Sequence, residues 1–286
     1  VLELMDHILP MVDIEVSRLA EKRMTKDGIL FRLGAKVSRV KDDTVYYEFG
    51  GQNCQVKSDM VLMAVGRVPN TQGLNAKGIG IEFDRKAIRT DAHMRTNIPH
   101  IYAIGDVNGK VMLAHTASHE GMVAVADICG QGEEMRYDRI PSCVYLEPEI
   151  ACIGLTEAQA AAAGFDAVSA TCVVGDKAHY YPGSGEFIIK VIADRSTTRL
   201  LGVQVLGAGA VDKVVDVAVA AIAMKAALSD LYGQHVTDRI GEISAAMAAE
   251  GTAEELIHAI HPHPTVNEAL GEAFMAAWNG RAINSL

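Results

Sequence analysis

The C-terminal part of the chain contains the segment His261-Pro262-His263-Pro264, with Glu268 a few residues further on. The prolines favour an extended backbone here, because a residue that precedes proline is disfavoured in a helix. A carboxylate beside an imidazole orients the ring and favours its protonated form. The pair His263 and Glu268 therefore has the chemistry of a general base that works near neutral pH.

Two other interpretations of this segment remain open. Thr265 and Glu268 have the spacing of a capping box at the start of a helix. Alternatively, His258, His261 and His263 could ligate a metal ion, although no cysteine or aspartate stands nearby to complete the ligand set. His115 and His119, with Glu120 beside them, offer a second metal interpretation, against which a solvated or capping role has to be weighed.

Two acidic residues stand where strand-like apolar segments end. Asp106 follows Gly105 and the apolar run 101–104, and open α/β sheets bind ligands beyond the carboxyl ends of their strands. An ionised carboxylate only accepts hydrogen bonds, so Asp106 suits a sugar or ribityl hydroxyl, with a turn or helix cap as the alternative. Glu3 ends the first strand-like segment and has the type of residue that accepts from a ribose 2′-OH in dinucleotide folds.

The cysteines provide no further chemistry of this kind. They are Cys54, Cys129, Cys143, Cys152 and Cys172, and no two have the spacing C-x-x-C or C-x4-C. Such scattered cysteines indicate neither a disulfide framework nor a zinc site nor a redox-active dithiol. Cys143 and Cys172 stand among β-branched and apolar neighbours, so we expect them to be small buried side chains.

The composition limits the class of protein. The chain has 286 residues, 49% of them hydrophobic and 22% charged, with a net charge of −10. These values are typical of a globular chain of about two domains, and the acidic balance argues against nucleic acid or anionic membrane partners. The longest apolar run, 217–224, is too short for a membrane span, and the N-terminus lacks the pattern of a signal peptide. We therefore expect a soluble, cytoplasmic protein.

The elements that must position these residues follow from the hydrophobic spacing. The first part of the chain predicts an α/β arrangement, in which 59–65 and 101–104 are strands buried on both faces and 67–100 is rich in turns. Amphipathic spacing predicts helices over 14–26 and 115–129. Short strands are expected at 30–31, 37–40, 45–49 and 55–57.

The pattern changes to α+β near Pro141. We expect an antiparallel sheet with a short helix in it, and helices throughout the region beyond 208. Residues 212–231 weakly resemble 238–256, through either duplication or chance similarity between Ala-rich helices. The expected strands are 144–146, 150–153, 167–174, 186–193 and 200–206, and the short helix is 157–163.

Four segments together resemble the pyridine nucleotide–disulfide oxidoreductase family, and within it the dihydrolipoamide dehydrogenases. They are Ala64-Val-Gly-Arg-Val-Pro-Asn70, Thr96-Asn-Ile-Pro-His-Ile-Tyr-Ala-Ile-Gly-Asp106, the stretch from Ile140 to Glu157 with its Glu147-Pro148-Glu149 and Gly154-Leu155-Thr156-Glu157, and His261 to Glu268. The resemblance covers nearly the whole chain. It implies partial Rossmann-like FAD- and NAD(P)-binding domains, followed by an α+β dimerisation domain.

The resemblance also implies boundaries and roles. Residues 1–66 would be part of an NAD domain, 67–140 the second part of an FAD domain and 141–286 the interface domain of a homodimer. For the cofactors it implies that Glu3 contacts the adenosine ribose of NAD and that Gly105 and Asp106 contact the flavin ribityl or phosphate region. Gly66, Arg67 and the run Met112, Leu113, Ala114 and His115 would be further cofactor contacts, the run lining the isoalloxazine ring. His263, before a cis Pro264, would be the base of the partner subunit's site, with Glu268 beside it.

The sequence also departs from the family pattern. The glycine-rich FAD and NAD loops and the redox-active cysteine pair are not found in it. Segments 178–183, 201–204 and 211–222 resemble instead the coenzyme A-disulfide reductase and NADH oxidase branch. An inserted helical pair within 207–257 is one interpretation of this mixture.

We therefore expect the C-terminal portion of an oxidoreductase that moves electrons between a dithiol or disulfide and NAD through FAD. A 2-oxoacid dehydrogenase complex is a candidate partner, and we expect the chain alone to be inactive. The alternatives are a non-catalytic dimerisation or scaffold module and a part of a coenzyme A-disulfide reductase or NADH oxidase.

Overall fold

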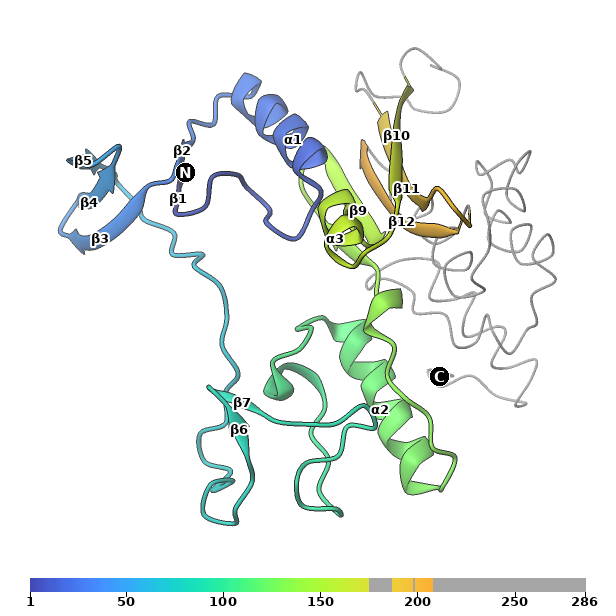
Figure 1. The fold of residues 1–286 in the computed structure, drawn as a ribbon. Coiled ribbons are helices and arrows are strands. Elements are labelled where there is room, and N and C mark those ends of the chain that lie inside the picture. The colour runs from blue at the N-terminus through green and yellow to red at the C-terminus, as the bar shows by residue number, and fades with distance from the viewer. Residues whose placement is uncertain (175–186, 198, 208–286) are drawn as a thin grey trace, which may run out of the picture. The chain divides into compact units, whose positions relative to one another are not determined.

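The computed structural model describes residues 1–174, 187–197 and 199–207 (Figure 1). The described residues fall into two compact units. The first comprises Val1–Ala64 together with the residues from Ser142 onward, and the second comprises Val65–Pro141. The domain boundaries expected near residues 66 and 140 stay a prediction.

The first unit begins with a β-α-β arrangement. Strand β1 (Leu2–Glu3) pairs in parallel with β2 (Arg32–Leu33), and helix α1 (Ile14–Lys26) connects them. A parallel pair requires such a crossover, so the α/β character predicted for this part of the chain is confirmed. A separate antiparallel sheet follows, made of β3 (Lys36–Lys41), β4 (Thr44–Phe49) and β5 (Gln52–Lys57).

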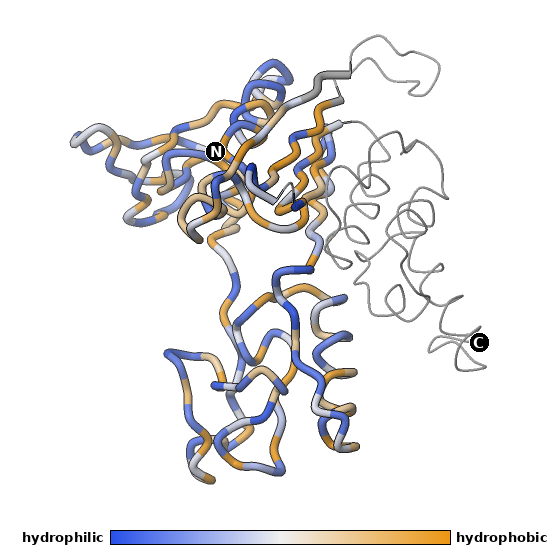
Figure 2. The backbone as a smooth tube through the Cα atoms, turned by 45° about the vertical axis from the view of Figure 1, so that its right-hand side comes forward, coloured by the Kyte–Doolittle hydropathy of each residue, from blue (hydrophilic) through white to orange (hydrophobic). Residues whose placement is uncertain are grey.

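The larger sheet of the first unit is antiparallel, in the order β10-β11-β12-β9-β8. Its central strand β12 is buried along its whole length, and most of the sheet carries the apolar colour in Figure 2. The short helix α3 (Glu157–Ala162) has a capping box formed by Thr156 and Gln159. The antiparallel sheet predicted for this region is confirmed. Its strands are β8 (Ser142–Val144), β9 (Glu149–Gly154), β10 (Ala167–Val174), β11 (Phe187–Asp194) and β12 (Leu200–Gly207).

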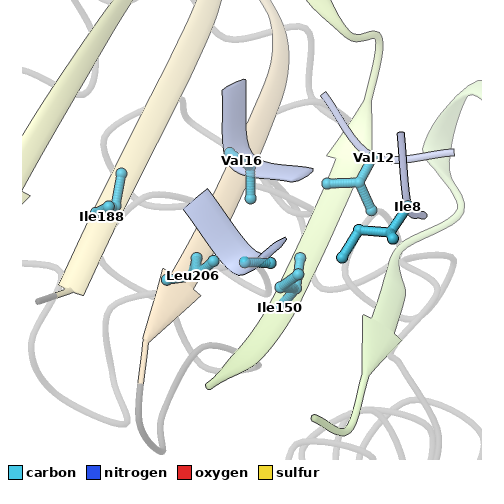
Figure 3. Close-up of a cluster of buried hydrophobic side chains, with 7 residues drawn as sticks. Ile8, Val12, Val16, Ile150, Ile188 and Leu206 are labelled. Carbon is cyan, nitrogen blue, oxygen red and sulfur yellow. The ribbon is translucent and has the colours of Figure 1, made fainter. Parts of the chain in front are cut away.

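Helix α1 packs on this sheet and forms the main core of the first unit (Figure 3). Its N-cap Asp13 accepts from the Glu15 amide, and basic residues in the last turn complement the helix dipole. Val16 and Ala20 face inward and are almost completely buried. The cluster contains Ile8, Val12, Val16, Ala20, Ile150, Ile188 and Leu206. The N-terminal helix and the antiparallel sheet therefore share one core.

A buried lysine adds a polar link between the same elements. The Lys190 ammonium on β11 is 4% exposed and lies 3.0 Å from Asp13 Oδ1, 3.1 Å from Glu15 Oε2 and 2.8 Å from Glu157 Oε2. Burial alone would lower the pKa of Lys190, but its hydrogen bonds to Glu157, Asp13 and Glu15 outweigh that effect and raise it. The ammonium thus joins α1, α3 and the sheet.

The second unit contains the hairpin of β6 (Phe83–Asp84) and β7 (Ala87–Ile88), helix α2 (Ala114–Ile128) and two short 3₁₀ turns. The turns are η1 (Gly105–Asn108) and η2 (Tyr137–Arg139). Helix α2 begins one residue before the predicted position, and its C-cap Cys129 is followed by Gly130, which has φ +80°. Apolar clusters around Met94 and around Ala103 form the cores of this unit.

Two predicted buried strands are wrong. Residues 59–65 form no strand, and Leu62 and Val65 are each 89% exposed. Residues 101–104 contribute only one isolated bridge, from Tyr102 to Arg95, and Ile104 is 43% exposed. A strand buried on both faces needs neighbours on both edges to pair its backbone groups, and no strand among the described residues pairs with either segment.

Several predictions lie outside the described residues. These are the helices beyond 208, the weak repeat and the inserted pair within 207–257. Within the described ranges, no helix is long and apolar enough to cross a membrane.

Candidate functional site

Arg67 brings two of the predicted cofactor residues together in the second unit. Its Nη2 donates to the Asp106 carboxylate and, over 3.3 Å, to the carbonyl oxygen of Met112. The side chain of Asp106 remains 50% exposed, so its other lone pairs are accessible to a ligand. An arginine, a half-exposed carboxylate and an apolar residue therefore meet at the turn after residues 101–104.

The two glycines predicted to contact a cofactor have backbone conformations that other residues rarely adopt. Gly105 has φ +73°, and a Cβ at this position would lie 3.2 Å from the Cβ of Ala117 on α2. Gly66 has φ +99° in open space. At Gly105 the absence of a side chain thus serves both the turn and its close approach to α2.

Helix α2 begins directly after Met112. Leu113 is its N-cap and makes no side-chain cap hydrogen bond, and Ala114 and His115 form the first turn. The first amides of a helix have no intrahelical acceptor, and they carry a partial positive charge that favours anionic or electron-rich ligand groups. His115 Nε2 lies 2.8 Å from the carbonyl oxygen of Pro141, which fixes its ring beside this helix end.

A cavity of about 580 Å³ adjoins Arg67 and Met112. The Thr90 hydroxyl in its wall has no hydrogen-bond partner within the described structure. Burial lowers the pKa of Lys110, another lining residue. The lining residues carry several positive charges against one carboxylate: Arg67, Arg85, Lys86, Arg89 and Lys110 against Asp84. The cavity beside the predicted cofactor residues therefore favours an anionic ligand.

The remaining predicted site residues are not part of this cluster. Glu3 ends β1 in the first unit, where its Oε1 accepts from the amide of Met5 at 2.8 Å. His263 and Glu268, as well as His258 and His261, lie outside the described residues. Over the described part of the chain, no group of three or more His, Cys, Asp or Glu side chains could hold a metal ion, so the metal interpretation of His115, His119 and Glu120 has no support.

The described cysteines form no disulfide with one another. Burial raises the pKa of the Cys152 thiol to about 11, which keeps it protonated and unreactive near neutral pH. Cys143 is half-buried rather than fully buried, and the side chain of Cys172 lies outside the description.

Sequence reasoning missed the role of Glu120 in this region. Its carboxylate is fully buried and accepts hydrogen bonds from the Gly105 amide and from the side chains of Asn108 and Tyr137. The available signal was a glutamate on the inward face of a predicted helix, where a charged side chain requires partners.

Two family models match the chain. The model of the family "Pyridine nucleotide-disulphide oxidoreductase" matches residues 1–121, and the model of the dimerisation domain of the same family matches 140–234 and 230–274. The chain belongs to the pyridine nucleotide-disulphide oxidoreductase family.

Among its curated relatives are dihydrolipoyl dehydrogenases. One from Bacillus subtilis is 32% identical over 278 residues, and one from Rhizobium etli is 34% identical over 293 residues. These alignments cover 96% and 100% of this chain but 55% of each relative. The chain thus spans about half the length of the curated relatives it matches.

Two solved structures share the fold. A FAD-dependent pyridine nucleotide-disulphide oxidoreductase from Desulfovibrio vulgaris has a TM-score of 0.63 at 24% identity, covering 87% of this chain and 64% of that chain. A NAD-dependent persulfide reductase from A. fulgidus has a TM-score of 0.69 at 24% identity, covering 86% of this chain and 49% of the other. The first of these proteins is FAD-dependent and the second is NAD-dependent, and FAD and NAD are the two cofactors expected from the sequence of this chain.

Proposed function

We propose that this chain is the C-terminal portion of a dihydrolipoyl dehydrogenase-like oxidoreductase, which moves electrons between a dithiol or disulfide and NAD through FAD. The family and the relatives named dihydrolipoyl dehydrogenase support this proposal. The observation that carries it is the arrangement of Arg67, Asp106 and Met112 at the start of α2.

These residues fit a flavin. Asp106 keeps acceptor capacity for a ribityl hydroxyl, and the glycine at 105 lets this turn pack closely on α2. The start of α2, whose N-cap makes no side-chain hydrogen bond, offers amide donors. Met112, Leu113, Ala114 and His115 would line the ring system, and Gly66 and Arg67 would complete the contacts. Bound FAD would supply two-electron transfer between a thiolate and NAD.

The other roles are proposed from the family pattern. Glu3 would accept a hydrogen bond from the adenosine ribose of NAD. His263, oriented by Glu268, would take a proton from the dithiol in the site of the partner subunit. In a form of the protein that also carries the FAD loop and the cysteine pair, His263→Gln should reduce dithiol oxidation by about a hundredfold without loss of flavin. Unchanged turnover would remove His263 from the mechanism.

FAD binding tests the proposal directly. We expect the purified chain to quench the fluorescence of added FAD with a saturable isotherm, and we expect Asp106→Ala to weaken that binding about tenfold, since a charge-assisted hydrogen bond is lost. Asp138→Ala is a matched control, because Asp138 is 45% exposed and paired with Arg136 as Asp106 is paired with Arg67. Equal isotherms for the two variants would contradict the assignment of Asp106.

We expect the chain alone to lack dihydrolipoamide turnover. Its sequence contains no closely spaced cysteine pair, and the thiol of Cys152 is protonated near neutral pH. NAD-dependent turnover of dihydrolipoamide by the pure chain would contradict this expectation.

A second candidate is a non-catalytic dimerisation module, favoured by the dimerisation-domain match over the second half of the chain. A chain that binds no FAD yet has twice the 30.6 kDa mass in light scattering would support this candidate.

We also propose a homodimer for the flavoprotein, a cytoplasmic location and a 2-oxoacid dehydrogenase complex as partner. Fractionation of cells tests the cytoplasmic location, and a pull-down with the protein as bait tests the association with a 2-oxoacid dehydrogenase complex.

A further inference from the structure

A fully buried carboxylate lies beneath the turn that contains Asp106. Glu120, on the inward face of α2, is 0% exposed. Its Oε2 accepts from the Gly105 amide at 2.6 Å and from Asn108 Nδ2 at 2.8 Å, and its Oε1 accepts from the Tyr137 hydroxyl at 2.6 Å. Three donors thus satisfy a group that would otherwise be very unfavourable in the interior.

The donors tie down both ends of one short element. Gly105 is the first residue of η1 and Asn108 is the last. Asp106 lies between them and points its half-exposed carboxylate toward Arg67. The Glu120 carboxylate therefore holds the two ends of the turn while the ligand-facing residue remains accessible.

Tyr137 supports the carboxylate from the other side. Its hydroxyl is also 3.7 Å from the sulfur of Met94, which is fully buried. Burial raises the pKa of Tyr137, and the hydrogen bond to Glu120 raises it further, so the phenol stays protonated and donates. Tyr137 belongs to η2, so one of the three donors to Glu120 comes from outside the Gly105–Asn108 turn.

We propose that Glu120 is a positioning residue for the flavin site: its buried carboxylate fixes the Gly105–Asn108 turn in the conformation that presents Asp106. The inference rests on the proposed function for the identity of the ligand. The hydrogen-bond network itself is independent of any cofactor.

Three variants distinguish the hydrogen bonds of Glu120 from the filling of space by its side chain. Glu120→Ala removes all three bonds and leaves the Gly105 amide without its acceptor. Glu120→Asp keeps the charge but is one methylene shorter, so it cannot reach both ends of the turn. Glu120→Gln keeps an acceptor for Gly105 and Asn108, and the Tyr137 hydroxyl can rotate to accept from the new amide.

A test that needs no cofactor is to measure the hydrogen exchange rate of the Gly105 amide by NMR, on the full chain labelled with ¹⁵N-glycine. We expect at least about tenfold faster exchange at Gly105 in Glu120→Ala and Glu120→Asp, and nearly wild-type exchange in Glu120→Gln. Glu82→Ala is the control, because Glu82 is an exposed glutamate of the same unit that is 3.4 Å from Arg89. Exchange at Gly105 that is unchanged in Glu120→Asp would overturn the proposal, even if Glu120→Ala fails to fold.

FAD titration provides the second arm. We expect Glu120→Ala and Glu120→Asp to weaken FAD binding about tenfold, and Glu120→Gln to restore it to within about threefold of the wild type. Failure of Glu120→Gln to restore binding would overturn positioning through hydrogen bonds. If the wild-type chain binds no FAD, the proposed function fails, whereas the exchange at Gly105 still decides the role of Glu120.

Discussion

At the scale of single residues, the second unit depends on buried carboxylates that have well-defined donors. Besides Glu120, the side chain of Asp127 on α2 is only 5% exposed. It accepts from the Tyr102 hydroxyl at 2.6 Å and from Arg95 Nη2 at 2.8 Å. These bonds connect α2 to the segment that precedes the Gly105 turn, so the ionisation of Asp127 bears on the stability of the candidate site.

Asp127 should make the stability of the chain sensitive to acid. The hydrogen bond from Tyr102, together with Arg95, lowers the pKa of Asp127. A lowered native pKa gives stability that is fully present above the unfolded value of about 4 and is lost as the pH falls through the native value. We expect Asp127→Asn to lower Tm at pH 7 and to flatten the loss of Tm between about pH 5 and pH 2.

Thermal unfolding across this pH range checks the prediction. Glu82→Gln, in which an exposed carboxylate is changed, should leave the pH profile nearly unaltered. A profile for Asp127→Asn as steep as that of the wild type would show that other groups control the acid transition.

At the scale of elements, α1 and the five-stranded sheet are held by an apolar core and by the Lys190 cluster. Replacing Lys190 with methionine keeps the volume but leaves the carboxylates of Asp13, Glu15 and Glu157 without their cation. Breaking a buried ion pair from one side costs about 3–5 kcal/mol, and the partial exposure of Glu15 and Glu157 places the cost at the low end, about 3 kcal/mol. Chemical denaturation should report that decrease in the free energy of unfolding.

Lys57→Met is the matched control for Lys190→Met. Lys57 is 80% exposed and lies 3.3 Å from Asp43, so its ion pair should contribute less than about 1 kcal/mol. Equal effects of the two substitutions would contradict the role assigned to the buried ammonium.

The elements that sequence reasoning predicted well are those with local signals. Helix α1 has the bounds predicted from its regular apolar spacing, and the structure adds that Asp13 caps its first turn. The contacts of Glu120 and Lys190 depend on partners far along the chain, which periodicity does not reveal. For residues 59–65 the local signal itself was misleading. An apolar run forms a buried strand only where other strands lie beside it, and these residues are exposed.

At the scale of the molecule, the two family matches together cover most of the chain. The model of the oxidoreductase family covers residues 1–121, and the model of its dimerisation domain covers most of the remaining residues. The chain spans about half the length of the curated relatives it matches. The fold brings Arg67, Asp106 and Met112 together at the place where we propose that the flavin binds. We therefore expect this cluster to bind FAD.

Hydrogen exchange of the purified chain with and without saturating FAD tests this claim most directly. We predict that FAD protects the peptides spanning Gly105 to His115 and leaves those of β9, β11 and β12 unchanged, and that Asp106→Ala reduces the protection. Absence of protection over Gly105 to His115, or equal protection in Asp106→Ala, would contradict the assignment of the flavin site.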